Sequence, residues 1–190
     1  MSFSRRSLGL LLGLAIVLVL AAGGLLTARH LYAESKLQRA ADTASPTRFS
    51  GDWDKAAVSV LIIGDSRVAR WSPLPKDDKI AFALSGSGGE TSHELLGRAG
   101  RQVQSLSPDV VVILVGVNDV VAAQVNPSKA AKLEAALSQN VIQIAQSSKS
   151  AGAKPIIAAI GQAGPIDWRR RLMGIDDELY IRIEKANQDL

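Results

Sequence analysis

The residue with the clearest chemical potential in this chain is Ser66, which follows a buried-looking strand. The apolar run Val58–Ile63 stops at Gly64, and Asp65 and Ser66 follow where a sheet would pass the chain to a helix. A serine held there is lifted off the sheet edge, with its hydroxyl exposed and a helix N-terminus close by. These conditions suit the nucleophile of an acyl-transfer reaction, and we predict that role for Ser66.

A second polar residue, Asn118, follows another strand further along the chain. The run Val110–Val115 is apolar throughout, as expected when both faces of a strand are covered, and Gly116 ends it. Ligands of parallel sheets gather at the carboxyl ends of the strands, so Ser66 and Asn118 are predicted to meet at one edge. Taken singly, each also suits an ordinary turn that bonds its own backbone. The occurrence of both at strand ends indicates a site.

Composition excludes several other classes of function. The chain has 190 residues, a formal net charge of +4 and no cysteine, which excludes disulfides, thiolate catalysis and cysteine-ligated zinc. Its basic residues are scattered and form no face with interleaved aromatics, so nucleic acid is not a predicted partner. Asp65, Glu90 and Asp119 lack the spacing of metal ligands, and no phosphate-binding loop is present. We therefore predict no metal and no cofactor.

The N-terminal segment predicts a membrane helix. Arg5 and Arg6 precede a charge-free apolar run, Ser7–Ala28. About twenty apolar residues cross a hydrocarbon core, whereas the apolar region of a cleaved signal is usually shorter. We expect a basic tail at 1–6 and a single-pass transmembrane signal anchor at 7–28, with the large domain on the extracytoplasmic side. The alternatives are cleavage near Ala21–Gly23 and a twin-arginine export signal.

After a predicted linker at 29–54, the pattern becomes regular and indicates one domain at 55–190. Apolar runs alternate with segments of helical spacing, and Thr91 with Glu94 forms a capping-box pattern at the start of one of them. The predicted strands are 57–63, 80–84, 108–115 and 154–160. The predicted helices are 91–106, 128–150 and 176 onward, and 67–71 is predicted as a helix start or a turn. Residues 161–174 are predicted to form a loop. This alternation predicts a parallel sheet with helices on both faces.

Three short blocks together resemble the SGNH, or GDSL-type, hydrolase family. The blocks are Gly64–Ser66, Gly86–Thr91 and Gly116–Asp119, and their order, spacing and placement at strand ends agree with the first three blocks of that family. The resemblance covers about residues 57–190. It implies a three-layer α/β/α, flavodoxin-like fold and an ancestral chemistry of ester hydrolysis or acyl transfer.

The resemblance also implies a role for each of three residues. Ser66 would be the nucleophile; its own N–H, the N–H of Gly89 and the side-chain amide of Asn118 would form the oxyanion hole. Gly89, rather than Gly86 or Gly88, is assigned because it directly precedes the Glu-Thr that matches the family's second block. Attack on an ester puts negative charge on oxygen, and each donor fixed in advance is worth about 3 kcal/mol.

Two features depart from the family's pattern. Arg67 stands where many members have an aliphatic residue. We expect it to form a surface ion pair; the alternatives are a pair with an acidic neighbour and binding of an anionic substrate. The family's base is a histidine in a late Asp-x-x-His block, and this chain has no histidine after His93. We expect the chain to be part of a longer protein that carries that block; the alternative is a member that binds without turnover. His93, on the first turn of a helix, is expected to be solvent-exposed rather than a replacement base.

The function expected from these observations is that of an exported, membrane-anchored SGNH-type serine esterase acting on carboxylic esters, O-acetyl esters included. Its partners would be a small-molecule or polysaccharide ester and, through the N-terminal helix, the membrane. The alternatives are a non-catalytic carbohydrate-binding or assembly protein and a polysaccharide O-acetyltransferase. The basic cluster Arg169–Arg171 is predicted to be a solvated loop, or else a clamp for acidic sugars or lipid headgroups.

Overall fold

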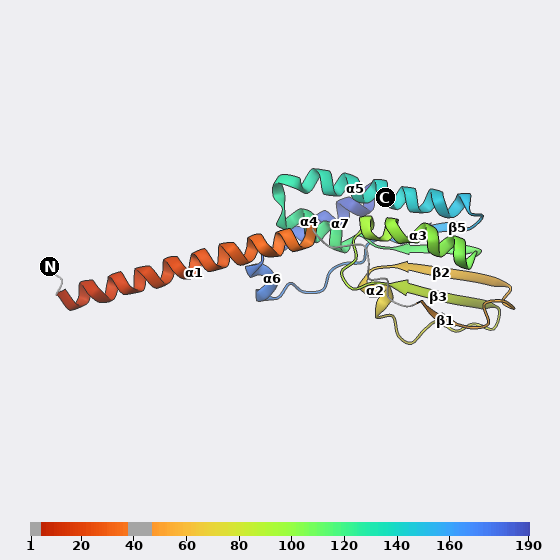
Figure 1. The fold of residues 1–190 in the computed structure, drawn as a ribbon, viewed down its shortest axis with the longest axis horizontal. Helices are drawn as coiled ribbons and strands as arrows, with labels where there is room; N and C mark the ends of the chain where they lie inside the picture. The colour runs from red at the N-terminus through yellow and green to blue at the C-terminus, as the bar shows by residue number, and fades with distance from the viewer. Residues whose placement is uncertain (1–4, 38–46) are drawn as a thin grey trace.

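The computed structural model of the protein describes residues 5–37 and 47–190. A long N-terminal helix, α1 (Arg5–Leu37), leads to a domain built around one five-stranded sheet (Figure 1). The elements after α1 are β1 (Arg48–Ser50), β2 (Val58–Gly64), α2 (Ser66–Ala69), β3 (Ile80–Gly86), α3 (Ser92–Leu106), β4 (Val110–Leu114), α4 (Val117–Val125), the 3-10 helix η1 (Pro127–Lys129), α5 (Ala130–Ser150), β5 (Lys154–Ile157), α6 (Trp168–Leu172) and α7 (Glu178–Asp189).

The sheet has the strand order β1-β3-β2-β4-β5. The central strand β2 runs parallel to β3 and β4, and β5 runs parallel to β4. The predicted α/β fold, with helices on both sides of the sheet, is confirmed. The sheet is nevertheless mixed, because β1 pairs antiparallel with β3 at the edge. This short strand lies inside the segment predicted as a linker, and three residues are too few to show a strand periodicity.

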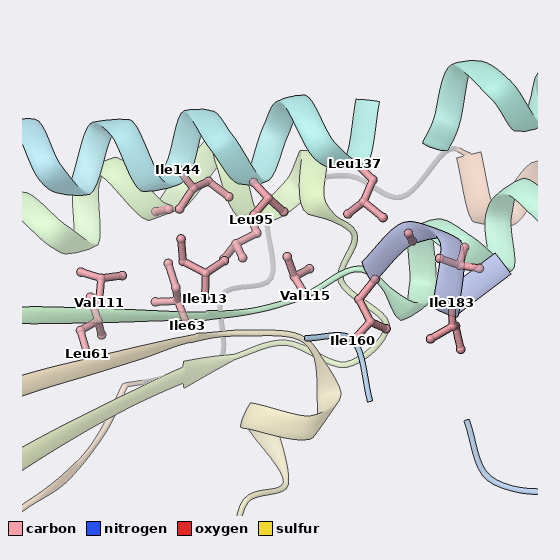
Figure 2. Packing of buried hydrophobic residues seen from close by; sticks show 14 of the residues in the cluster. Leu61, Ile63, Leu95, Val111, Ile113, Val115, Leu137, Ile144, Ile160 and Ile183 are labelled. Atoms are coloured by element: carbon pink, nitrogen blue, oxygen red, sulfur yellow. The ribbon is translucent and has the colours of Figure 1, made fainter. Parts of the chain in front are cut away.

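The larger part of the core lies between the sheet and the helices α3 and α5. Leu61 and Ile63 of β2 and Val111 and Ile113 of β4 point to this face, and all four are buried. Figure 2 shows them beneath the two helices, with Leu95 of α3 packed among them. The spacing of two residues within each strand is what places these side chains on one face of the sheet.

The opposite face of the sheet has a thinner cover. Ile62 of β2 and Leu84 of β3 pack there against Val68 of the one-turn helix α2, with Leu74 beside them. At the edge of the sheet, β5 leaves Ile156 and Ile157 exposed. The helices α3 and α5 therefore provide most of the packing that stabilises the sheet, and α2 shields only its centre.

Helix α3 begins with the capping box predicted from the sequence. Thr91 is the N-cap, and its hydroxyl accepts the backbone N–H of Glu94. The Glu94 carboxylate in turn accepts the backbone N–H of Thr91 at 2.7 Å. The backbone N–H groups of Thr91 and Glu94 would otherwise lack partners at the helix start. Each is satisfied by the side chain of the other residue.

Helix α1 continues beyond the expected span at 7–28 and contacts the domain with its last turns. Ala33 is buried, and its carbonyl accepts the side-chain amide of Asn126 at 3.3 Å. The segment expected as a linker, 29–54, therefore carries regular structure at both ends, in α1 and β1. Residues 38–46 of that segment, and residues 1–4 of the expected basic tail, lie outside the described residues.

Three further details differ from the sequence pattern. Helix α4 was not predicted, because its valines favour strands by local propensity; packing against α5 and α7 overrides that preference. Strand β5 ends at Ile157 rather than at 160. The region expected as a loop at 161–174 contains the short helix α6, which Asp167 caps by accepting the N–H of Arg170 at 2.9 Å.

At Gly64 the central strand approaches its neighbour too closely for a side chain. A Cβ there would lie 2.0 Å from the carbonyl oxygen of Leu114. We expect Gly64→Ala to lower the free energy of unfolding by about 3 kcal/mol, because the backbone of a central strand cannot move aside. Thermal unfolding of the detergent-solubilised chain, followed by circular dichroism, measures the loss.

The matched control is Gly100→Ala in α3, where a Cβ would have no atom within 4 Å. Alanine favours a helix over glycine, so the Tm of this variant should stay the same or rise. A Gly64→Ala protein that melts with the wild type would contradict the close approach of β2 and β4.

Candidate active site

Three loops meet at the carboxyl edge of the sheet. They follow the neighbouring strands β2, β3 and β4, whose register sets Gly64 opposite both Gly86 and Leu114. The N–H of Asp65 donates to the carbonyl of Leu114 at 3.2 Å, and the N–H of Ser87 donates to the carbonyl of Gly64 at 3.1 Å. These backbone hydrogen bonds join the segments that carry the three sequence blocks.

Ser66 is the first residue of α2 and is partly exposed. Asp65 caps this helix, its carboxylate accepting the N–H of Arg67 at 2.9 Å. The backbone N–H at the first position of a helix has no acceptor within the helix. The structure therefore places Ser66 at a strand-to-helix turn, with both its hydroxyl and its N–H at the edge of the sheet.

Arg67 pairs with the carboxylate of Asp65, whose side chain is fully buried. Its Nε donates to Oδ1 at 3.1 Å and its Nη2 donates to Oδ2 at 2.8 Å. The sequence left three alternatives open for Arg67, and the structure shows the pair with an acidic neighbour. The two-pronged contact, added to the capping hydrogen bond, fixes the turn that presents Ser66.

Gly89 lies in a turn that glycine adopts at little cost. Its φ of +72° is in the left-handed region, where a side chain would be strained. The turn closes with the N–H of Glu90 donating to the carbonyl of Ser87 at 3.4 Å. Without a Cβ at Gly89, a ligand can approach the backbone closely, as the role expected from the family requires.

Asn118 lies in the first turn of α4 and contacts the loop that carries Gly89. Its Nδ2 donates to the carbonyl of Glu90 at 2.9 Å. A carboxamide has two N–H bonds, so this contact orients the side chain and leaves a second donor. The preceding Gly116 has a φ of +130°, and a Cβ there would lie 2.6 Å from Ile160. The turn that delivers Asn118 thus requires glycine.

Beneath these loops lies a buried ion pair between Arg98 of α3 and Glu90. Their atoms are 2.5 Å apart from Nε to Oε1 and 2.6 Å apart from Nη2 to Oε2, and each side chain is 5% exposed. Arg98 also donates to the hydroxyl of Ser85 at 2.9 Å and to the carbonyls of Ser85 and Gly64 at 3.2 and 3.4 Å. One guanidinium thus joins the ends of β2 and β3 to the Gly89 loop.

Arg98 was not predicted as a site residue, although its position in the sequence carries a signal. Arg98 follows Leu95 by three residues, on the face of α3 that packs against the sheet. A charged residue on the apolar face of a helix requires a buried partner. Burial raises the pKa of that partner, Glu90, and the hydrogen bonds and charge of Arg98 act in the opposite direction.

The sequence model of the GDSL-like lipase/acylhydrolase family matches residues 62–190. The chain belongs to this family. The resemblance predicted from the three blocks is therefore confirmed. No curated protein matches the chain.

Solved structures agree with this GDSL-family fold. A GDSL-like lipase from Bacteroides thetaiotaomicron superposes with a TM-score of 0.51 at 23% identity, over 84% of this chain and 69% of that one. The lipase/acylhydrolase from Enterococcus faecalis gives a TM-score of 0.50 at 20% identity, over 70% of each chain. At these identities the similarity establishes a shared fold.

In this GDSL-family domain a further buried carboxylate, Asp119, joins α4 to α3. Its Oδ1 accepts the hydroxyl of Ser92 at 2.6 Å, and its two oxygens accept the N–H of Ser92 at 3.1 and 2.9 Å. Asn140 of α5 donates to the same hydroxyl at 3.0 Å. Burial raises the pKa of Asp119 to about 6, although the hydrogen bonds from Ser92 oppose the rise. Because Asp119 adjoins Asn118, the network also holds the oxyanion-hole candidate in place.

His93, the only histidine within residues 47–190, is exposed, as the sequence predicted. It lines a cavity of about 220 Å³ together with Thr91, Asp119 and residues of α1 and α5. In the part of the chain that the structure describes, no hydrogen bond joins His93 to Ser66. Within residues 5–37 and 47–190, no group of three or more His, Cys, Asp or Glu side chains is placed to hold a metal ion.

Removing the Arg98 guanidinium should destabilise the domain. Arg98→Met leaves Glu90 buried without its cation, which typically costs about 3 to 5 kcal/mol. Glu90 can escape part of that cost by taking up a proton, so we expect the loss to be smaller at pH 5 than at pH 8. Urea unfolding at both pH values measures it. Arg101→Met, on the exposed side of the same helix, is the control and should change stability little; equal effects of the two substitutions would refute the buried pair.

Asp119 should make stability fall as pH rises from about 4 to 6. Its pKa is raised in the folded protein, so between the unfolded and folded values the folded state holds the extra proton. Asp119→Asn keeps one acceptor oxygen for Ser92 and removes the titration. From about pH 4 to 6, the free energy of unfolding of the wild type should therefore fall relative to that of Asp119→Asn. Above this range the difference between the two should stay constant. A difference that does not vary with pH would show that Asp119 has an ordinary pKa.

Proposed function

We propose that this protein is a membrane-anchored serine esterase in which Ser66 attacks a carboxylic ester, O-acetyl esters included. The observation that carries the proposal is the arrival of Ser66, Gly89 and Asn118 at the ends of three adjacent parallel strands. Membership of the GDSL-like lipase/acylhydrolase family supports ester chemistry.

The proposed reaction begins when Oγ of Ser66 bonds to the carbonyl carbon of the ester. The electron pair of the C=O bond moves to its oxygen, and the resulting oxyanion is held by the N–H of Ser66, the N–H of Gly89 and Nδ2 of Asn118. Collapse of this intermediate expels the alcohol, and water then releases the acid from the acyl-serine. The donors act because the turns and the Asn118–Glu90 hydrogen bond orient them before the charge appears.

The serine proton must pass to a base for this reaction to be fast. The resemblance assigns that role to a histidine in an Asp-x-x-His block, which the 190 residues do not contain. The proposal therefore rests on the nucleophile and the oxyanion donors, and its experiment addresses those groups.

The proposed anchor is α1. The stretch Leu11–Leu37 is long and apolar enough to cross a membrane, with a mean hydropathy of 2.5 in its most apolar window, none of which is buried against the domain. A signal sequence near the N-terminus has the same properties, and the length of the apolar run favours an uncleaved anchor. We propose that the domain lies on the extracytoplasmic side of the membrane.

Hydrolysis of p-nitrophenyl acetate by the full-length protein tests the assignment. Ser66→Ala should abolish turnover and labelling by a fluorophosphonate, since the attacking oxygen is gone. Asn118→Ala should keep the labelling site and lower kcat by about 100- to 1,000-fold, the usual effect of deleting one oxyanion donor. Ser105→Ala, an exposed serine of α3, is the control and should behave as wild type. Activity that survives Ser66→Ala would remove the nucleophile from the proposal.

A second candidate function is saturable binding of a carbohydrate without turnover. It is favoured by one observation: the single histidine within residues 47–190, His93, is exposed and has no hydrogen bond to Ser66. This candidate predicts glycan binding by a full-length protein whose Ser66 is not labelled by a fluorophosphonate. Transfer of the acyl group to an added polysaccharide, in place of water, would instead identify an O-acetyltransferase.

A further inference from the structure

The short helix α6 lies against α1, at the end of the domain from which α1 leaves (Figure 1). Nε of Arg29 in α1 donates to the carbonyl of Leu172 at 2.6 Å, and its Nη2 donates to the carbonyl of Arg171 at 3.4 Å. The last carbonyls of a helix lack partners within the helix and attract positive charge. Arg29 therefore serves as a cap that attaches α6 to α1 over a sequence distance of more than a hundred residues.

The position of Arg29 along α1 sets the level of α6 relative to a membrane. Arg29 is the first charged residue after the apolar run Ser7–Ala28. At 1.5 Å per residue, that run is about 33 Å long, close to the thickness of about 30 Å of a hydrocarbon core. If α1 spans the membrane, Arg29 lies where the core gives way to the headgroups, and α6 lies beside it.

The side chains of α6 are of the types found at that level. Trp168 is 66% exposed and Leu172 is 39% exposed, so both apolar groups face outward. Arg169 and Arg170 are also exposed, and the Arg169 guanidinium lies 5.3 Å from the centre of the Trp168 ring. Tryptophan and arginine combine an apolar body with a polar or charged end, which suits the boundary between lipid and water.

Not all of the charge on α6 is available to a partner. Arg171 pairs with Asp177 at 2.8 Å, and Asp167 at the start of the helix and Asp176 beyond it add negative charge nearby. The attraction to an anionic surface must therefore come from Arg169 and Arg170.

We propose that α6 is a membrane-docking element whose Trp168 and Leu172 enter the headgroup region while Arg169 and Arg170 bind the phosphates of anionic lipids. The proposal rests on the membrane anchoring put forward under the proposed function. An anchor alone lets a domain tilt and rotate, whereas a second contact beside the anchor fixes its orientation. Figure 1 shows α2 near the middle of the domain, with the arrows of β2 and β3 pointing toward the end of the domain where α6 lies. Docking therefore turns the Ser66 edge toward the membrane surface.

The experiment uses the full-length chain in lipid nanodiscs of phosphatidylcholine, with or without phosphatidylglycerol, that contain brominated acyl chains as quenchers of tryptophan fluorescence. The signal of Trp168 is the difference between wild type and Trp168→Phe. It should be quenched in the anionic discs and much less in the zwitterionic ones. Each arginine removed should lower the ratio of docked to undocked α6 by about fivefold, so Arg169→Gln/Arg170→Gln should largely abolish the quenching.

The control is Arg101→Gln/Lys154→Gln, which removes the same charge from exposed positions on other elements of the domain and should leave quenching unchanged. A second measurement, extraction of the membranes with alkaline carbonate, tests the anchor itself. If carbonate leaves the chain in the membrane, the docking proposal is overturned by a Trp168 signal that is not quenched, or that is quenched equally in both kinds of disc. Extraction by carbonate would instead show that the anchor itself is wrong, and the docking with it. Labelling of Ser66 is independent of both results.

Discussion

A guanidinium and a carboxylate, taken out of water beneath the ends of β2 and β3, hold the loops of the candidate site. Arg98 bonds the carbonyls of Gly64 and Ser85 as well as both oxygens of Glu90. The backbone carbonyl of Glu90 accepts the amide of Asn118. A buried pair of this kind adds little net stability against an apolar replacement, but it tolerates few other geometries. The domain uses it to relate three strand ends to one another.

Two other buried carboxylates extend this arrangement to the helices that begin at the same edge. Asp65 caps α2, and Asp119 accepts the N–H of Ser92 at the start of α3. Helix starts carry unpaired N–H groups and partial positive charge, so carboxylates suit them even where burial is costly. The helices α2, α3 and α4 consequently all begin at the carboxyl edge of the sheet, with Ser66 and Asn118 in the first turns of α2 and α4.

The parts of the fold that could be predicted from sequence are those with a strong local pattern. The apolar runs that became β2 and β4 and the Thr91–Glu94 capping box carry their structure in residue type and spacing. Helix α4 and strand β1 could not be predicted, because burial against other elements and edge pairing with β3 decide them. For the same reason β5 is shorter than its apolar run, and the expected linker begins within α1.

By itself, the sequence determined the family, the alternation of strands and helices, and the strand-end positions of Ser66, Gly89 and Asn118, because motifs and periodicity are local properties of a chain. Only the tertiary structure decided how those residues are held. The Arg98–Glu90 pair, the contact of Asn118 with the Gly89 loop and the attachment of α6 to α1 join residues far apart in sequence. No local pattern encodes such contacts, since they depend on the order of strands in the sheet and on which surfaces the folded helices bring together.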